Sequence, residues 1–322
     1  MIEEDVMISS FFAKPRILFV TPELAFMPEG TGNSTDYINT HIGGFGDLAA
    51  GLISDLFDLG VDVYVAQPNY RRIFEELSRR NCFTGVKKIP GDRVHLTRDR
   101  VFFYSNYLHS NFQWENTKVS LAFQREVINH VIPKVQPDLL HCHDWMTGLI
   151  PAMAKKIEIP CLFSVQNPVT AKSLLSYAED MGMDAAAFWQ NLFYDRYPIN
   201  YEETRGSNLV NFLLSGIFAA NFVSTSSSAF LAKTGKNQNL FAKASIWEAL
   251  VNKMNAGCAA VNSNLAKTQQ FVDIYERMLQ RPLLQPEKEE FKSHAVSSPH
   301  GIKLLDWGER KARRVQASPL YA

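Results

Sequence analysis

A glycine-rich loop at the start of a predicted helix is the first segment whose residues are suited to binding a ligand. Gly43, Gly44 and Gly46 stand just before residues with the apolar spacing of a helix. Backbone amides at a helix amino terminus hold phosphate well, because they lack intrahelical partners and face the positive end of the helix dipole. A dinucleotide-binding fingerprint would place such glycines directly after a strand. More than twenty residues separate these glycines from Val20, which argues against an NAD-binding site. The loop is then either a phosphate-binding site or an ordinary tight turn.

A second segment places polar side chains where a strand is expected to end. His141 and His143, two residues apart on a strand, point the same way and suit a metal ion. No third ligand follows at a suitable spacing, so a metal site is disfavoured. We expect one histidine to pack in the core and Asp144 to face a cleft, where its carboxylate would bind sugar hydroxyls. Trp145 either stacks on a sugar or fills the core.

A third segment, residues 187–197, combines five aromatic side chains with polar groups. Glucan-binding proteins use aromatic platforms flanked by hydrogen-bonding groups. Aromatic residues at helical spacing pack in a core more often than they bind ligand. Both interpretations remain open from the sequence.

Alternating strands and helices must position these residues. Short apolar runs predict strands at residues 16–20, 61–66, 139–143, 160–165 and 222–225. Helical spacing between them predicts helices at residues 47–56, 118–132, 145–155 and 207–220, the first capped by Asp47 and ended by Gly60. This order is typical of a doubly wound parallel sheet, an α/β Rossmann-like fold. Ligands of such sheets bind at the carboxyl ends of the strands, where Glu23, Asp144, Gln166 and Asn167 fall.

Composition excludes several classes of protein. The 322 residues are 46% hydrophobic and carry 33 basic and 33 acidic side chains, so a large core is expected and a nucleic-acid partner is not. Four cysteines without a Cys-x-x-Cys pair argue against a disulfide scaffold or a zinc ribbon. We see no targeting or membrane segment, which predicts a cytoplasmic protein without a membrane partner.

The strand signal stops near Gly235. Helices are expected at residues 245–260 and 267–279, and Pro282 closes the second. Residues 285–322 are polar and without period, and they include a basic cluster at 310–314, so we expect a mostly disordered tail there.

Four stretches together resemble the amino-terminal half of the bacterial glycogen/starch synthases. They are residues 17–23, 43–48, 136–151 and 215–225, in that order. The resemblance implies one half of a two-Rossmann GT-B glucosyltransferase, which moves glucose from a nucleotide sugar, usually ADP-glucose, to the non-reducing end of an α-1,4-glucan. It implies no metal and no other cofactor. It also implies a donor-phosphate loop at His41, Gly43, Gly44 and Gly46, catalytic positions at Asp144 and Gln166, and acceptor contacts at Glu23, His143, Trp145 and Asn167.

The sequence departs from this family at functional positions. His41 stands where the family has a lysine, so a fixed positive charge near the phosphate is lost. Gln166 stands where the family has a histidine that contacts the transferred glucose, and an amide carries no proton. Residues 225–228 read Thr-Ser-Ser-Ser where the family has Thr-Val-Ser-Pro.

The largest departure concerns the second Rossmann domain, which we expect to be deleted. Residues 252–260 resemble the approach to the interdomain linker, and residues 271–283 resemble the helix that returns to the first domain. About ten residues separate them, too few for a domain. The predicted organisation is an extension at 1–15, a synthase-like domain at 16–262, a return helix at 263–284 and a tail at 285–322.

Three roles are compatible with this organisation. The chain is a synthase-like protein that is not competent alone, or it is a non-catalytic glucan-binding or regulatory partner of a full-length synthase. An active transferase that borrows a donor domain from another chain is the third alternative. Without the second domain, Glu23, Phe45, Asp144, Trp145 and Gln166 would form an exposed face, which predicts a homo-oligomer or glucan binding.

Overall fold

The computed structural model describes residues 14–24, 44–70, 91–105, 110–166, 169–225 and 264–284. Residues Pro15–Leu283 form one compact unit, which carries all of the elements described below. None of the helices within these ranges has the length and apolar character needed to cross a bilayer.

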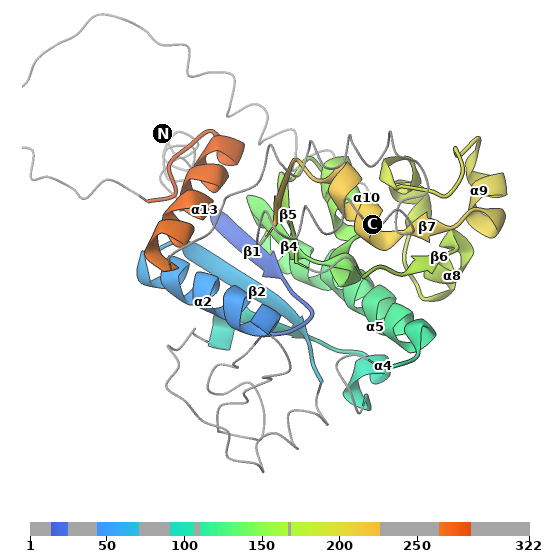
Figure 1. Cartoon of the computed structure of the whole chain (residues 1–322), viewed down its shortest axis with the longest axis horizontal. Coiled ribbons are helices and arrows are strands. Elements are labelled where there is room, and N and C mark those ends of the chain that lie inside the picture. Colours follow the sequence, from blue (N-terminus) through green and yellow to red (C-terminus); the bar gives the residue numbers. More distant parts are fainter. Residues whose placement is uncertain are drawn as a thin grey trace, which may run out of the picture. The chain divides into compact units, whose positions relative to one another are not determined.

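A parallel sheet of six strands forms the centre of this unit (Figure 1). In spatial order β3-β2-β1-β4-β5-β8, its strands are Val94–Thr97, Asp62–Pro68, Arg16–Val20, Leu139–His143, Cys161–Val165 and Phe222–Thr225. Neighbouring strands pair in parallel throughout. The predicted α/β fold with a doubly wound parallel sheet is therefore confirmed.

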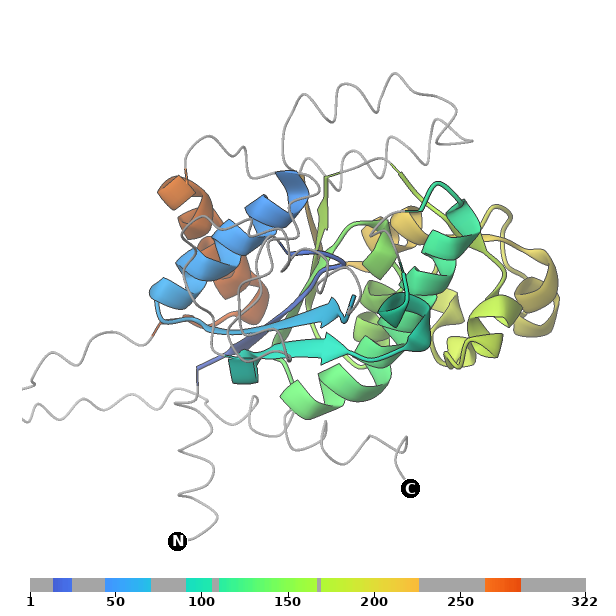
Figure 2. The same ribbon diagram turned by 90° about the horizontal axis from the view of Figure 1, so that it is seen from below.

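Helices cover both faces of the sheet (Figures 1 and 2). One face carries α2, Gly44–Asp58, and α13, Asn264–Leu279; the other carries α5, Gln113–Glu126, α7, Ile150–Lys156, and α10, Phe212–Ala219. Shorter elements complete the second side: α4, Arg100–Phe103, α8, Leu175–Asp180, α9, Tyr201–Ser207, and an antiparallel pair of strands, β6, Lys172–Ser173, with β7, Val210–Asn211.

Side chains alternate between the two faces because successive residues of a strand point to opposite sides. Leu140 and Cys142 of β4 point into the large hydrophobic cluster beneath α5, α7 and α10. His141 and His143 point the other way, toward α2 and α13, and their rings lie 4.4 Å apart between centroids. The prediction that the two histidines share one face is thus confirmed.

The carboxyl end of α2 follows the sequence prediction, whereas its amino end does not. Gly60 has a φ of +82°, and the amides of Gly60 and Val61 donate to the carbonyls of Phe57 and Leu56. These two bonds form the glycine-ended helix stop that was expected. The helix begins at Gly44, so the predicted cap at Asp47 is wrong, since that residue lies inside the first turn.

The helix predicted at 118–132 is longer than expected. It begins at Gln113, passes through a π-helical turn at Val127–Val131 and ends with α6, Ile132–Val135. Pro133 has no amide hydrogen to give to the preceding turn. The wider turn directly before it accommodates this missing donor without ending the helix.

Two predicted helices are interrupted. Residues 145–155 form a short 3₁₀ turn, Trp145–Thr147, and then α7, with Gly148 between them. Residues 207–220 divide into the end of α9, strand β7 and α10. Asn211 caps α10, because its side-chain oxygen accepts the Leu214 amide at 3.0 Å, and this local bond competes with a continuous helix.

The helix predicted at 267–279 is confirmed as α13, and it packs back onto the sheet unit. Its Thr268 hydroxyl donates to Asp55 of α2 at 2.9 Å, and just beyond it Arg281 forms an ion pair with Asp138 at 2.8 Å. The predicted helix at 245–260 and the expected tail at 285–322 lie outside the described residues.

Candidate functional site

The carboxyl edge of the sheet gathers several of the predicted site residues. Because all six strands are parallel, Glu23 after β1, Asp144 after β4 and Gln166 after β5 lie at one edge. Helix α2 ends beside the start of β2 and runs antiparallel to the strands, so its amino terminus at Gly44 points toward the same edge. The fold therefore brings together groups from three strand ends and one helix start.

Asp144 is the most constrained residue at this edge. Its φ of +56° and ψ of 179° form a backbone conformation that residues other than glycine rarely adopt. Three sets of hydrogen bonds hold it there. Its amide donates to the Ser164 carbonyl at 2.9 Å, its carboxylate accepts the Gln166 amide at 2.8 Å, and its carbonyl accepts both the amide and the hydroxyl of Thr147. The side chain thereby ties the end of β4 to the end of β5.

The backbone of Asp144 leads to a stability prediction. We expect the free energy of unfolding of Asp144→Gly, measured in urea, to exceed that of Asp144→Ala by about 1–2 kcal/mol. Both variants lose the carboxylate, but only glycine adopts the positive φ without strain. Asp144→Asn keeps an oxygen that accepts the Gln166 amide and serves as the matched control. Equal stability of the glycine and alanine variants would show that the conformation is not strained.

Glu23 and Gln166 are the other predicted site residues that the structure describes at the ends of β1 and β5. Glu23 is buried, and its carbonyl accepts the Thr21 hydroxyl at 2.8 Å. Burial, and after it the nearby charge of Glu23, raise the pKa of the Tyr70 phenol, so Tyr70 stays protonated. Gln166 is partly exposed. The next residue, Asn167, for which an acceptor contact is predicted, lies outside the described residues. So do His41 and Gly43 of the predicted phosphate loop.

The glycine loop is described only from the start of α2 onward. Gly44 is the first residue of the helix and Gly46 is buried in its first turn. The first amides of a helix have no intrahelical acceptor, so the 15-residue α2 presents a terminus suited to an anion at the carboxyl edge. This observation agrees with the predicted phosphate cradle and does not test it.

The two histidines of β4 are both buried. Burial lowers the pKa of His143 to about 3, and burial together with His143 lowers the pKa of His141 well below its usual value. Both rings are therefore neutral near pH 7 and do not shuttle protons to a ligand. Within the described ranges, no three acidic, histidine or cysteine side chains cluster closely enough to hold a metal ion.

His141 takes part in a buried chain of hydrogen bonds that the sequence did not reveal. Its Nδ1 lies 2.7 Å from the Tyr275 hydroxyl of α13, and its Nε2 lies 2.6 Å from the Ser164 hydroxyl of β5. Ser164 in turn lies 2.6 Å from the Ser224 hydroxyl of β8. No spacing in the sequence links these four residues, because they come from four different elements.

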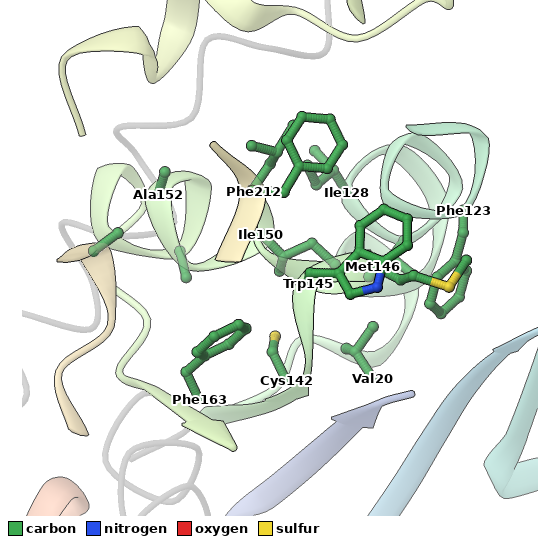
Figure 3. Packing of buried hydrophobic residues seen from close by; sticks show 14 of the residues in the cluster. Val20, Phe123, Ile128, Cys142, Trp145, Met146, Ile150, Ala152, Phe163 and Phe212 are labelled. Carbon is green, nitrogen blue, oxygen red and sulfur yellow. The ribbon is translucent and has the colours of Figure 1, made fainter. Parts of the chain in front are cut away.

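Trp145 belongs to the core rather than to an open surface (Figure 3). It is 6% exposed and lies among Met146, Phe123 and Phe212, with 6.3 Å between its ring centroid and that of Phe212. Of the two interpretations of Trp145, this position favours packing over stacking on a sugar.

The aromatic segment at 187–197 also packs mainly inward. Phe188 and Tyr194 are buried, and Trp189 packs on the same hydrophobic cluster. Tyr197 differs, since 90% of it is exposed. The structure favours the packing interpretation for most of this segment.

The predicted exposed face at the carboxyl edge is wrong for three of its members. Glu23, Asp144 and Trp145 are each less than one-tenth exposed. Backbone groups of neighbouring residues hold Asp144, and Trp145 lies in the hydrophobic core. Gln166 alone among the described members is partly accessible, and the side chain of Phe45 lies outside the described residues. What remains accessible among the described residues of this edge is Gln166, whose carboxamide donates and accepts hydrogen bonds and suits a neutral ligand rich in hydroxyls.

Comparison with known proteins identifies relatives of this chain. The family model for the starch synthase catalytic domain matches residues 16–234. A glycogen synthase from Exiguobacterium sibiricum is 25% identical over 225 residues, which make up 61% of this chain and 44% of that protein. A glycogen synthase from Cellvibrio japonicus is 26% identical over 221 residues, or 58% of this chain and 42% of that protein. The chain thus spans less than half the length of these relatives.

A solved structure shares the fold. The catalytic domain of Starch Synthase IV from Arabidopsis thaliana, bound to ADP and acarbose, superposes with a TM-score of 0.52 at 15% identity and covers 78% of this chain and 52% of that one. The family match takes in every strand of the six-stranded sheet and more than half of all residues. The chain therefore belongs to the starch synthase catalytic domain family.

Proposed function

We propose that this chain binds an α-glucan at the carboxyl edge of its sheet and supplies the acceptor half of a synthase-type site, without transferring glucose by itself. The observation that carries the proposal is the position of Asp144 and Gln166, joined at the ends of β4 and β5 within the matched family region. The resemblance assigns these positions to the active site of a glucosyltransferase whose acceptor is a glucan.

The residues at this edge favour binding over proton transfer. Gln166 offers a carboxamide that donates and accepts hydrogen bonds but does not titrate. His143, the residue before Asp144, is enclosed and neutral. Transfer from a sugar diphosphate also needs cationic groups that stabilise the departing phosphate, usually the largest contribution to such catalysis. In the resembled family those groups lie in a second domain.

The chain length between β8 and α13 supports the second part of the proposal. Only residues 226–263 separate β8 from α13, which packs on the same unit as the sheet. An independent domain needs more residues than this interval contains. We therefore propose that the donor-binding domain is deleted between them, that any ADP-glucose is held with the help of another chain, and that a full-length synthase in the cytoplasm is the partner.

Glucan binding is tested by the electrophoretic mobility of the protein in native gels that contain glycogen. We expect glycogen to retard the wild-type chain and Gln166→Ala to weaken the apparent affinity about threefold to tenfold, because one or two hydrogen bonds to hydroxyls are lost. Phe218→Ala is the control, since it removes a partly exposed aromatic ring near the end of α10, just before β8 begins at the opposite end of the sheet. Unretarded migration of the folded wild type would contradict the proposed binding, and equal weakening by Phe218→Ala would contradict its location.

A further inference from the structure

A buried tyrosine on α13 begins a chain of hydrogen bonds that includes residues of three strands. Tyr275 is fully enclosed, and its hydroxyl lies 2.7 Å from His141 Nδ1. From His141 the chain of hydrogen bonds continues to Ser164 and Ser224, at 2.6 Å each. One side chain of α13 is thus connected to β4, β5 and β8, although it lies more than 100 positions beyond β4 in the sequence.

The direction of this chain follows from the chemistry of its members. A neutral imidazole has one donor and one acceptor nitrogen, so one of its two bonds must be donated and the other accepted. A phenol is a stronger acid than an aliphatic hydroxyl and is the better donor. Tyr275 therefore donates to Nδ1 and Nε2–H donates to Ser164, whose hydroxyl shares a further hydrogen bond with that of Ser224.

Ser164 connects this chain to the candidate site. Its hydroxyl is held by His141 and Ser224, while its carbonyl accepts the Asp144 amide at 2.9 Å. Asp144 in turn accepts the Gln166 amide at 2.8 Å. In the sheet, Ser164 lies opposite His143 of β4 and Ser224 of β8. His143 directly precedes Asp144, so these hydrogen bonds run across the strands next to the site residues.

We infer that Tyr275 is a positioning residue, through which α13 fixes the spacing of β4, β5 and β8 at the carboxyl edge and thereby the Asp144–Gln166 pair. The inference goes beyond the proposed function and does not depend on it. On this inference the position of α13 controls the site. Displacement of this helix removes the Tyr275 hydroxyl, the first donor of the hydrogen-bond chain, and loosens the ends of all three strands.

The surroundings of His141 make the hydroxyl of Tyr275 hard to replace. The His141 ring is fully buried against Phe19, Phe271 and His143, with centroid distances of 4.7, 5.5 and 4.4 Å. Phe19 and Phe271 carry no group that could donate to Nδ1, and the His143 ring is uncharged. Loss of the Tyr275 hydroxyl therefore leaves a buried acceptor without its partner, which costs more than an ordinary hydrogen bond.

Tyr275→Phe tests the inference, with amide hydrogen exchange measured residue by residue by NMR. We expect the amides of Asp144 and Gln166 to exchange at least tenfold faster, while amides of β1 and β2 stay within twofold of wild type. Tyr194→Phe is the matched control, because it also deletes a buried tyrosine hydroxyl, one that donates to the Trp189 carbonyl at 2.6 Å. This control should leave Asp144 and Gln166 within twofold.

Two results would overturn the inference. Unchanged exchange at Asp144 and Gln166 in Tyr275→Phe would show that α13 does not position the edge. A uniform increase across β1, β2 and the edge would show that the hydroxyl supports global stability only. Should Tyr275→Phe not fold, Ser224→Ala tests the chain from its other end, with exchange at Asp144 and Gln166 expected to rise at least threefold and the same two results counting against it.

Discussion

Gly148→Ala is expected to leave almost no folded protein. Gly148 lies in the turn between the 3₁₀ segment and α7, where a Cβ atom would sit 2.0 Å from the Phe212 carbonyl oxygen and 2.6 Å from its carbon. These are backbone atoms at the start of α10, which is buried on nearly every side. Relief of the overlap requires α10 to move away from α7, and we expect a loss of more than about 4 kcal/mol.

Circular dichroism and urea unfolding of the purified variant measure this effect. Gly51→Ala is the matched control, because Gly51 lies inside α2 and a Cβ there meets no atom within 4 Å. The control should be stabilised by about 0.5–1 kcal/mol, as is usual when glycine is replaced by alanine within a helix. A Gly148→Ala variant that unfolds cooperatively within 1 kcal/mol of wild type would refute the close approach of α7 and α10.

Acidification is expected to destabilise the chain steeply, which is the second large effect. His141 and His143 are buried and have pKa values lowered by burial, to about 3 for His143. In the unfolded chain these histidines have the ordinary pKa of about 6.5. Below that pH they are therefore protonated in the unfolded chain but remain neutral in the folded chain, which favours unfolding. The stability from both groups is complete above pH 6.5 and declines as the pH falls toward the folded pKa. Between pH 7.5 and 5.5 we expect a loss of about 3 kcal/mol from the two together.

Urea unfolding at a series of pH values measures this loss. His143→Gln removes one of the two buried imidazoles and should reduce the loss to about half. His130→Gln replaces a histidine whose side chain is 69% exposed and serves as the control. A free energy of unfolding that stays constant from pH 7.5 to 5.5 would contradict the buried, neutral state of the pair.

Five of the six strands of the sheet were predictable because each is a short apolar run. The sixth, β3 at Val94–Thr97, was missed because its apolar and polar residues alternate over only four positions. Residues 139–143 and 222–225 form strands within the predicted bounds, since a strand buried on both faces requires such a run. The helix ends were less predictable. Gly148 and Asn211 interrupt expected helices through contacts with Phe212, Leu214 and Thr170, partners that no local pattern identifies.

The candidate site was predictable in its place but not in its accessibility. Parallel strand order alone brings Glu23, Asp144 and Gln166 to one edge. The enclosure of Glu23 and Asp144 arises from tertiary packing and backbone hydrogen bonds, which spacing does not encode. The connection from Tyr275 to Ser224 was also hidden, because it depends on α13 docking over β4.

The decisive measurement is the incorporation of radiolabelled glucose from ADP-glucose into glycogen, with native-gel retardation by glycogen measured beside it. We predict that the purified chain is retarded by glycogen yet incorporates no label alone, and that it changes the rate of an added full-length synthase. Label incorporated by the purified chain in the absence of any other synthase would contradict the claim that it holds only the acceptor half of the site.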